Sequence, residues 1–261
     1  MQEKGLPAYL AELIGTLFLV FFITSVVTLY VSTGAQAQFG SDFAVVGLTQ
    51  GLCLFGMIAI FGGVSGGHFN PAVTLAVAAI RRISPLDAVI YILAQLSGAV
   101  LGALLTKALL LDEGRASHYG AGHISGLLSG NTAGAAVEGI GVLVLVMVIL
   151  ATVFSKKSLK DWAPLAIGTT FVFLIMVGGP LTGGCFNPAR WFGPALVSNE
   201  WGGVWPFLVG PLVGAIVAVV VWMFVLEKGG TPAPTEPPQR VKAPASAKPA
   251  QAESSPKPAN P

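Results

Sequence analysis

The sequence is poor in charge. Aspartate, glutamate, lysine and arginine make up 10% of the 261 residues, whereas a soluble domain contains about 25%. The formal net charge is only +2, and its cations are spread over several loops, which argues against a nucleic-acid-binding surface. Because 54% of the residues are hydrophobic, the composition indicates a membrane protein.

Cysteine and histidine are also scarce. The two cysteines, Cys53 and Cys185, fall in a hydrophobic run and in a glycine-rich bend, so no disulfide framework is expected. His68 has no second ligand at a spacing typical of a metal site. The sequence therefore predicts no metal centre.

Six apolar stretches are long enough to cross a hydrocarbon core of ~30 Å as helices. Lysine and arginine gather on the side of the two termini, and Lys107 and Arg115 lie on the other side, so the positive-inside rule predicts cytoplasmic termini. The first stretch is interpreted as retained and not as a signal peptide. The six spans are placed near residues 8–31, 43–63, 85–110, 133–154, 162–179 and 203–226.

Residues 229–261 differ sharply in composition, because Pro, Ala, Ser, Lys and Glu dominate there. Such a segment cannot bury enough apolar surface to fold. We therefore divide the chain into a membrane domain over residues 1–228 and a disordered cytoplasmic tail over residues 229–261.

The membrane domain contains an internal repeat. Ser65–Ala72 aligns without gaps on Thr182–Ala189. Each half, about residues 8–110 and 133–227, holds three spans. Three is odd, so the second half must enter the membrane from the opposite side, which makes an inverted repeat.

Each aligned copy ends in Asn-Pro-Ala, which predicts the start of a helix, because Asn is a favoured N-cap and Pro is tolerated at the first helical position. Each following helix covers about eleven residues, so at ~1.5 Å per residue it crosses about half of the core. We expect an all-α membrane protein with six transmembrane helices and two re-entrant half-helices around a water-filled pore. The two tripeptides are Asn70-Pro71-Ala72 and Asn187-Pro188-Ala189.

Four polar residues in these apolar segments are expected to matter. Asn70 and Asn187 would stand side by side at the midplane and donate to a passing solute, while the two helix dipoles repel cations. Glu12 and Glu138 occupy equivalent repeat positions, and buried carboxylates need partners. Scaffolding is favoured over proton relay for this symmetric pair.

The motifs SGGHFNPAVT, GGCFNPARWFGPAL, AELIGTLFLVF and LAQLSGAVLGA are similar to those of the aquaporins, the major intrinsic protein family, over roughly residues 8–227. The resemblance implies a homotetramer in the bilayer that passes water and small neutral solutes, with no catalytic residue and no cofactor. It also implies that Glu12 and Glu138 accept hydrogen bonds from the re-entrant loops. His68 is then a vestibule or loop-packing residue, and Cys185, on a pore-lining bend, is a pore-lining or scaffold residue.

The resemblance assigns a selectivity filter to Gln50, Ile175, Gly184 and Arg190. A charge inside the membrane is costly and therefore functional by default, which supports the assignment of Arg190. At the four matching positions, water-selective members of the family typically carry Phe, His, Cys and Arg. Glycerol facilitators typically carry Trp, Gly, Phe and Arg there. The present set lacks the aromatic wall and the imidazole, so we expect a wider filter that passes ammonia or urea with water, and glycerol less well.

Several alternatives stay open. Trp191 could support Arg190, narrow the vestibule or simply pack, and His118 or His123 could fold over the pore mouth. A water-selective aquaporin is the main functional alternative. A secondary transporter would need a coupling ion, and a junction or interaction protein would conduct poorly. The expected location is the plasma (inner) membrane.

Overall fold

The computed structural model describes residues 5–31, 42–155 and 159–226. All regular structure in these ranges is helical, and six helices are long and apolar enough to cross a membrane, which confirms the predicted fold class. The predicted tail lies outside the described residues. The spanning helices are α1 (Leu6–Tyr30), α2 (Phe43–Ser65), α4 (Pro85–Leu109), α6 (Asn131–Ile149), α7 (Ala163–Thr182) and α9 (Val204–Val221).

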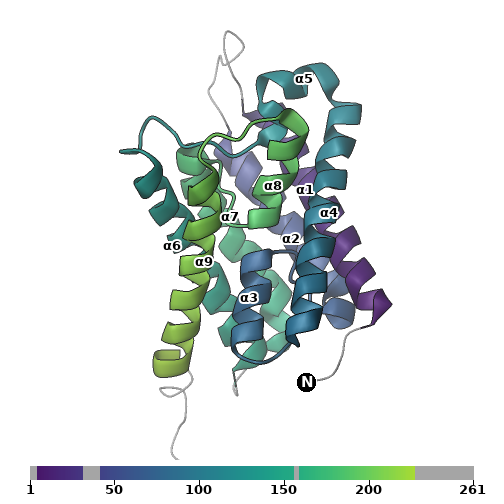
Figure 1. Cartoon of the computed structure of the whole chain (residues 1–261), viewed down its shortest axis with the longest axis vertical. Coiled ribbons are helices and arrows are strands. Elements are labelled where there is room, and N and C mark those ends of the chain that lie inside the picture. The colour runs from purple at the N-terminus through teal and green to yellow at the C-terminus, as the bar shows by residue number, and fades with distance from the viewer. Residues whose placement is uncertain (1–4, 32–41, 156–158, 227–261) are drawn as a thin grey trace, which may run out of the picture. The chain divides into compact units, whose positions relative to one another are not determined.

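Two short helices follow the Asn-Pro-Ala tripeptides. They are α3 (Pro71–Ala79), with 9 residues, and α8 (Pro188–Ser198), with 11 residues. Asn70 caps the first, because its side-chain oxygen accepts a hydrogen bond from Ala72 N, and Asn187 caps the second by accepting from Ala189 N. Figure 1 shows α3 and α8 one above the other at the centre, between α9 on one side and α4 on the other.

The long connection between α4 and α6 contains structure that the sequence does not reveal. A short helix, α5 (Leu111–Ala116), is followed by a 3₁₀ turn, η2 (His118–Gly120). His118 and Tyr119 have φ angles of 48° and 51°, in the left-handed region that most residues avoid. The Tyr119 hydroxyl donates to Leu111 O at 3.0 Å, which ties this turn back to the start of α5.

Glycines bring the spanning helices into close contact at equivalent places in the two halves. A Cβ added to Gly98 of α4 would lie 2.3 Å from Leu13 O of α1. A Cβ added to Gly214 of α9 would lie 2.1 Å from Gly139 O of α6. Helices in lipid associate by van der Waals packing rather than by excluding water, so small residues at crossings do much to hold the bundle together.

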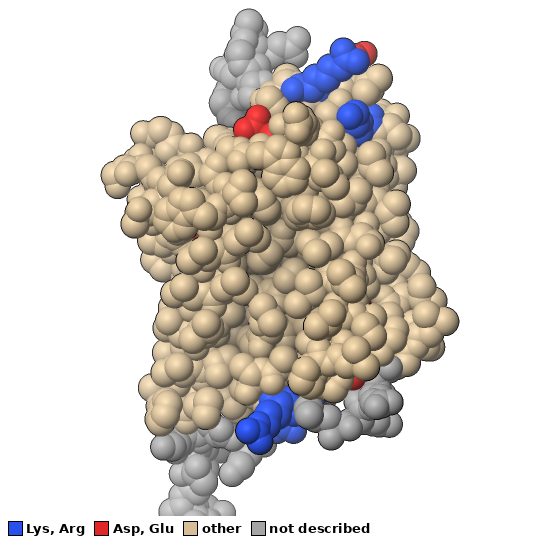
Figure 2. All heavy atoms as spheres, viewed as in Figure 1, with Lys and Arg blue, Asp and Glu red and all other residues tan. Residues whose placement is uncertain are grey.

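The outer surface matches an integral, multi-pass membrane protein. On the face that Figure 2 shows, lysine and arginine lie at the two ends, with almost no charge between them. Large apolar side chains are exposed along that middle zone, among them Phe22 of α1, Leu93 of α4 and Ile216 of α9. In lipid such exposure carries no hydrophobic penalty.

We predict that Gly214→Ala destabilises the protein by about 1–3 kcal/mol, the usual cost of overpacking. The new methyl group would meet backbone of α6, which cannot move aside as a flexible side chain could. Thermal unfolding of the purified protein in detergent measures the effect.

Gly56→Ala is the matched control, because a Cβ there meets no atom within 4 Å. It should leave the melting temperature unchanged or raise it, since Ala favours helix over Gly. Equal melting temperatures for the two variants would contradict the tight crossing of α6 and α9.

Candidate functional site

Glu12 organises the first re-entrant loop. It is fully buried in α1, and its carboxylate accepts hydrogen bonds from His68 N at 2.9 Å and Phe69 N at 2.7 Å. The Ser65 hydroxyl donates to the same carboxylate at 2.6 Å, and Gln95 Nε2 of α4 donates at 2.7 Å. These bonds satisfy loop N–H groups that have no helical partner and no access to water.

Glu138 repeats this arrangement in the second half. Its carboxylate accepts from Cys185 N at 3.0 Å and from Phe186 N at 2.5 Å, and the Thr182 hydroxyl donates to it at 2.6 Å. Both glutamates therefore act as acceptors for a loop, as the resemblance implies. The sequence reasoning missed the hydroxyl partners Ser65 and Thr182, although the repeat alignment pairs them.

A glycine three residues after each glutamate makes room for the loop. Phe69 and Phe186 precede the two capping asparagines, and their φ angles are 47° and 46°. The Phe69 ring occupies the space beside Gly15, where a Cβ would lie 2.2 Å from it. The Phe186 ring does the same beside Gly141, also at 2.2 Å. Positions i and i+3 share one face of a helix, so each helix supplies both the acceptor and the gap.

The two half-helices are joined where they meet. Asn70 Nδ2 donates to Phe186 O at 2.8 Å, and Asn187 Nδ2 donates to Phe69 O at 2.8 Å. Each asparagine thus bonds a carbonyl of the other half. An amide nitrogen carries two N–H groups, so each asparagine keeps one donor beyond this bond.

Both asparagines line one cavity of about 550 Å³. Its walls are mostly apolar, and it extends from Asn70 and Asn187 to Arg82 and Lys160 near one end of the bundle. His68 also lines it, with Nδ1 3.1 Å from Thr74 Oγ1 and the ring edge-on to Tyr91. His68 therefore lines the cavity and packs against neighbouring residues at the same time.

The Arg190 guanidinium contacts two backbone carbonyls and a cysteine sulfur. Its side chain is 1% exposed, and Nη1 donates to Gly120 O at 2.8 Å. Nη2 lies 3.4 Å from Gly183 O, and Nη1 lies 3.5 Å from Cys185 Sγ. No ion pair to a carboxylate is found for Arg190 within residues 5–31, 42–155 and 159–226. The described residues therefore do not support the alternative in which Arg190 is a purely structural residue paired with a carboxylate.

The other positions that the resemblance assigns to the filter are equally buried. Gln50 and Ile175 are both 0% exposed, and neither amide atom of Gln50 bonds to any residue that the structure describes. A Cβ on Gly184 would lie 2.9 Å from Ile175 Cδ1, so the isoleucine fills the space that the glycine leaves. Gly184 therefore leaves no open space on the side of Ile175.

Cys185 belongs to the scaffold and not to the cavity wall. Its thiol is 0% exposed and packs against Gly122, where a Cβ would lie 2.4 Å from Sγ. It is absent from the lining of the cavity that holds the asparagines. Of the two roles expected for Cys185, pore lining or scaffold, these contacts favour the scaffold, and its backbone N–H donates to Glu138.

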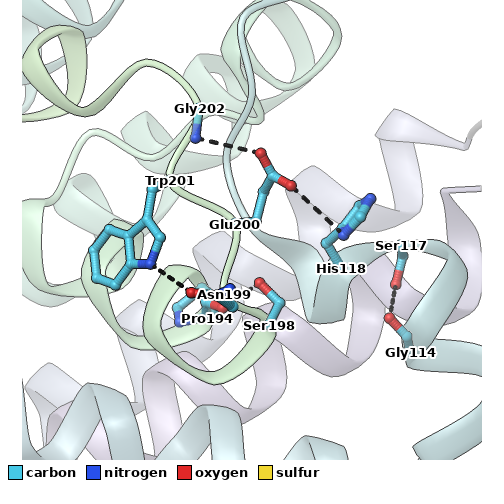
Figure 3. Close-up of polar contacts among 9 residues, drawn as sticks. All are labelled: Gly114, Ser117, His118, Pro194, Ser198, Asn199, Glu200, Trp201 and Gly202. Carbon is cyan, nitrogen blue, oxygen red and sulfur yellow. Dashed lines mark hydrogen bonds and ion pairs between the residues drawn. The ribbon is translucent and has the colours of Figure 1, made fainter.

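The connection between α4 and α6 reaches Arg190 through a carbonyl, Gly120 O, and not through a histidine. His118 is exposed, with Nδ1 3.9 Å from Glu200 Oε2, and His123 is also exposed. Figure 3 shows Glu200 between His118 and Gly202, after the end of α8. Backbone carbonyls carry no residue signature, so the sequence could not have identified Gly120.

Comparison with known proteins agrees with this geometry. A family model described as Major intrinsic protein matches residues 2–222. The chain belongs to the major intrinsic protein family. Members of this family are passive channels and not enzymes, so this major intrinsic protein is a channel of the aquaporin or aquaglyceroporin type.

Its relatives include both types. It is 38% identical to "Glycerol uptake facilitator protein-like 6" of Lactiplantibacillus plantarum over 220 residues, covering 80% of this chain and 94% of that protein. It is also 38% identical to "Probable aquaporin TIP2-2" of Oryza sativa over 227 residues, covering 86% and 89%. The X-ray structure of the aquaglyceroporin from Plasmodium falciparum shares the fold, with a TM-score of 0.71 at 23% identity, covering 84% and 96%.

We predict that Glu138→Gln lowers both the melting temperature and the water flux per molecule. The amide nitrogen of glutamine cannot accept a hydrogen bond, so a buried loop donor loses its partner, at a cost of about 1–3 kcal/mol. Stopped-flow light scattering on proteoliposomes measures the flux, and thermal unfolding measures the stability.

Glu113→Gln makes the same chemical change on the exposed face of α5 and serves as the control. It should alter neither quantity, because surface substitutions usually change stability little. If Glu138→Gln matched this control, the carboxylate would not be needed to hold the loop.

Proposed function

We propose that this major intrinsic protein conducts water and small neutral solutes, with ammonia and urea ahead of glycerol, and that it excludes protons and ions. The observation that carries the proposal is the meeting of Asn70 and Asn187 on one cavity, at the N-termini of two half-helices. This arrangement offers donors to a solute oxygen and offers no site for a cation.

The half-helices support the exclusion of protons. Each N-terminus carries roughly half a positive charge, and both point toward the asparagine pair. A water molecule that accepts from the free N–H of either asparagine is oriented with its hydrogens outward. Water molecules oriented in opposite directions on the two sides of this point cannot relay a proton.

Arg190 adds a full positive charge in the first turn of α8, beside the bend that joins α7 to α8. Carbonyls of Gly120 and Gly183 accept from its guanidinium but do not cancel its charge. Its Nε has no hydrogen-bond partner among the residues that the structure describes. We infer that Arg190 repels cations and donates to solutes in the filter.

Gln50 supports permeation by solutes with N–H groups. A buried polar group without a partner costs about 1–3 kcal/mol, so an amide kept in this state points to a role toward the solute. Its oxygen accepts from ammonia or urea and its nitrogen donates to water. No aromatic residue stands at the four filter positions to hold the carbon chain of glycerol.

A water-selective pore is the second candidate. It is favoured by the contact between Ile175 and Gly184, which reduces the width that the residue types alone suggest. The printed names of the relatives include aquaporins as well as a glycerol uptake facilitator, so they fit either candidate.

The remaining proposals concern assembly and orientation. The family resemblance supports a homotetramer in the plasma (inner) membrane and the domain limits of residues 1–228 and 229–261. Arg81, Arg82 and Lys160 lie beyond the ends of α3 and α6, opposite Lys107 and Arg115. This bias supports cytoplasmic termini.

The test is a permeability panel on proteoliposomes that contain the purified protein. Stopped-flow measurements with water, ammonia, urea and glycerol should show water and ammonia or urea flux well above that of protein-free vesicles. Glycerol flux should be smaller. The double variant Gln50→Phe, Ile175→His should suppress the solute flux and spare water, because it adds an aromatic plate and an imidazole to the filter.

Empty vesicles and the exposed-site variant Glu113→Gln are the controls. Water flux without any solute flux would establish the water-selective candidate instead. Water flux no higher than that of empty vesicles would contradict the proposal. The protein would then be a poorly conducting member of the family.

A further inference from the structure

Trp191 follows Arg190 in α8 and packs inside the protein. Its side chain is 2% exposed and stacks on Phe207 of α9, with ring centroids 5.7 Å apart and planes 13° apart. Trp201 approaches it edge-on at 5.9 Å. Trp191, Trp201 and Phe207 are called the aromatic block below. Of the roles open to Trp191, narrowing the vestibule is not supported.

The aromatic block lies behind the groups that hold Arg190. Cys185, whose sulfur is 3.5 Å from Arg190 Nη1, belongs to the same buried cluster as Trp191 and Phe207. A Cβ on Gly122 would lie 2.4 Å from Cys185 Sγ and 3.1 Å from a Phe207 ring carbon. The thiol and the Phe207 ring therefore pack closely against Gly122. Gly122 lies two residues after Gly120, whose carbonyl accepts a hydrogen bond from Arg190.

The ring of Trp191, and not its N–H group, makes these contacts. Its Nε1 is buried and has no hydrogen-bond partner among the residues that the structure describes. A buried donor without an acceptor is unfavourable, so the N–H group of Trp191 does not stabilise this arrangement. A flat ring stacked on another ring is the part that stabilises the cluster.

We propose that Trp191 is a positioning residue for the filter. It supports Phe207 and, through Phe207, the contact of Gly122 with Cys185, and so holds Gly120 O and Cys185 Sγ against the Arg190 guanidinium. This inference rests on the proposed role of Arg190 in the filter. Loss of the ring lets the connection between α4 and α6 and the guanidinium move, which relaxes the limits on solute size and on ions.

The experiment compares Trp191→Ala and Trp191→Phe with the unmodified protein in proteoliposomes. Two quantities are measured, the ratio of urea to water permeability and the proton leak under an imposed voltage. Trp191→Ala should raise the ratio by about tenfold, the effect of a 1.4 kcal/mol change in relative barrier, and should introduce a leak. Trp191→Phe, which keeps a stacking ring, should restore both quantities.

Trp222→Ala is the matched control. Trp222 is also a buried tryptophan with an unpartnered Nε1, but it belongs to the π turn Trp222–Leu226 that follows α9 and lies outside the cluster of Cys185 and Phe207. Its loss should lower the melting temperature and leave the permeability ratio unchanged. If Trp191→Ala yields too little folded protein, Trp191→Leu replaces it, since leucine keeps apolar bulk without a flat ring.

Two outcomes overturn the inference. One is a fall in water and urea flux by the same factor in Trp191→Ala, with no leak, which is the result of a purely structural role. The other is a Trp191→Phe variant that behaves like Trp191→Ala. Both differ from failure of the proposed function, in which the unmodified protein itself shows no flux above empty vesicles.

Discussion

The structure depends on satisfying loop N–H groups inside the membrane, where water is not available to do so. Glu12 and Glu138 meet this requirement by accepting from backbone N–H groups in the two re-entrant loops. The loops in turn place Phe69 O and Phe186 O where the asparagine of the opposite half can donate to them. Two buried carboxylates thus fix the point at which the half-helices meet, and the cavity lined by both asparagines begins at that point.

The two halves differ around the proposed filter. Gln95 of α4 donates to Glu12, whereas the repeat places Pro211 of α9 at the matching position, and proline has no donor. The first half-helix has Val73 where the second has Arg190. The symmetric scaffold therefore holds an asymmetric pore, with a mostly apolar cavity on one side of the asparagines and a caged cation on the other.

Much of this architecture could be predicted from the sequence because the two halves repeat the same residue types. The spans and the half-helices follow from hydropathy and alignment, and so do the equivalent positions of Glu12 and Glu138 in the two halves. The direction of the Cys185 thiol and the contact of Gly120 O with Arg190 do not, because they depend on backbone angles in loops. The contact of Ile175 with Gly184 cannot be predicted from the residue types either, because it depends on how the bend packs against α7.

The central claim is that the asparagine pair and Arg190 let water pass while protons are excluded. It is tested most directly by recording osmotic water flux and proton flux in one preparation of proteoliposomes, with a membrane potential imposed by a potassium gradient. The account predicts water flux well above that of empty vesicles and a proton flux equal to theirs. A proton flux that rises with the amount of protein would contradict the account. A water flux that does not rise with the amount of protein would also contradict it.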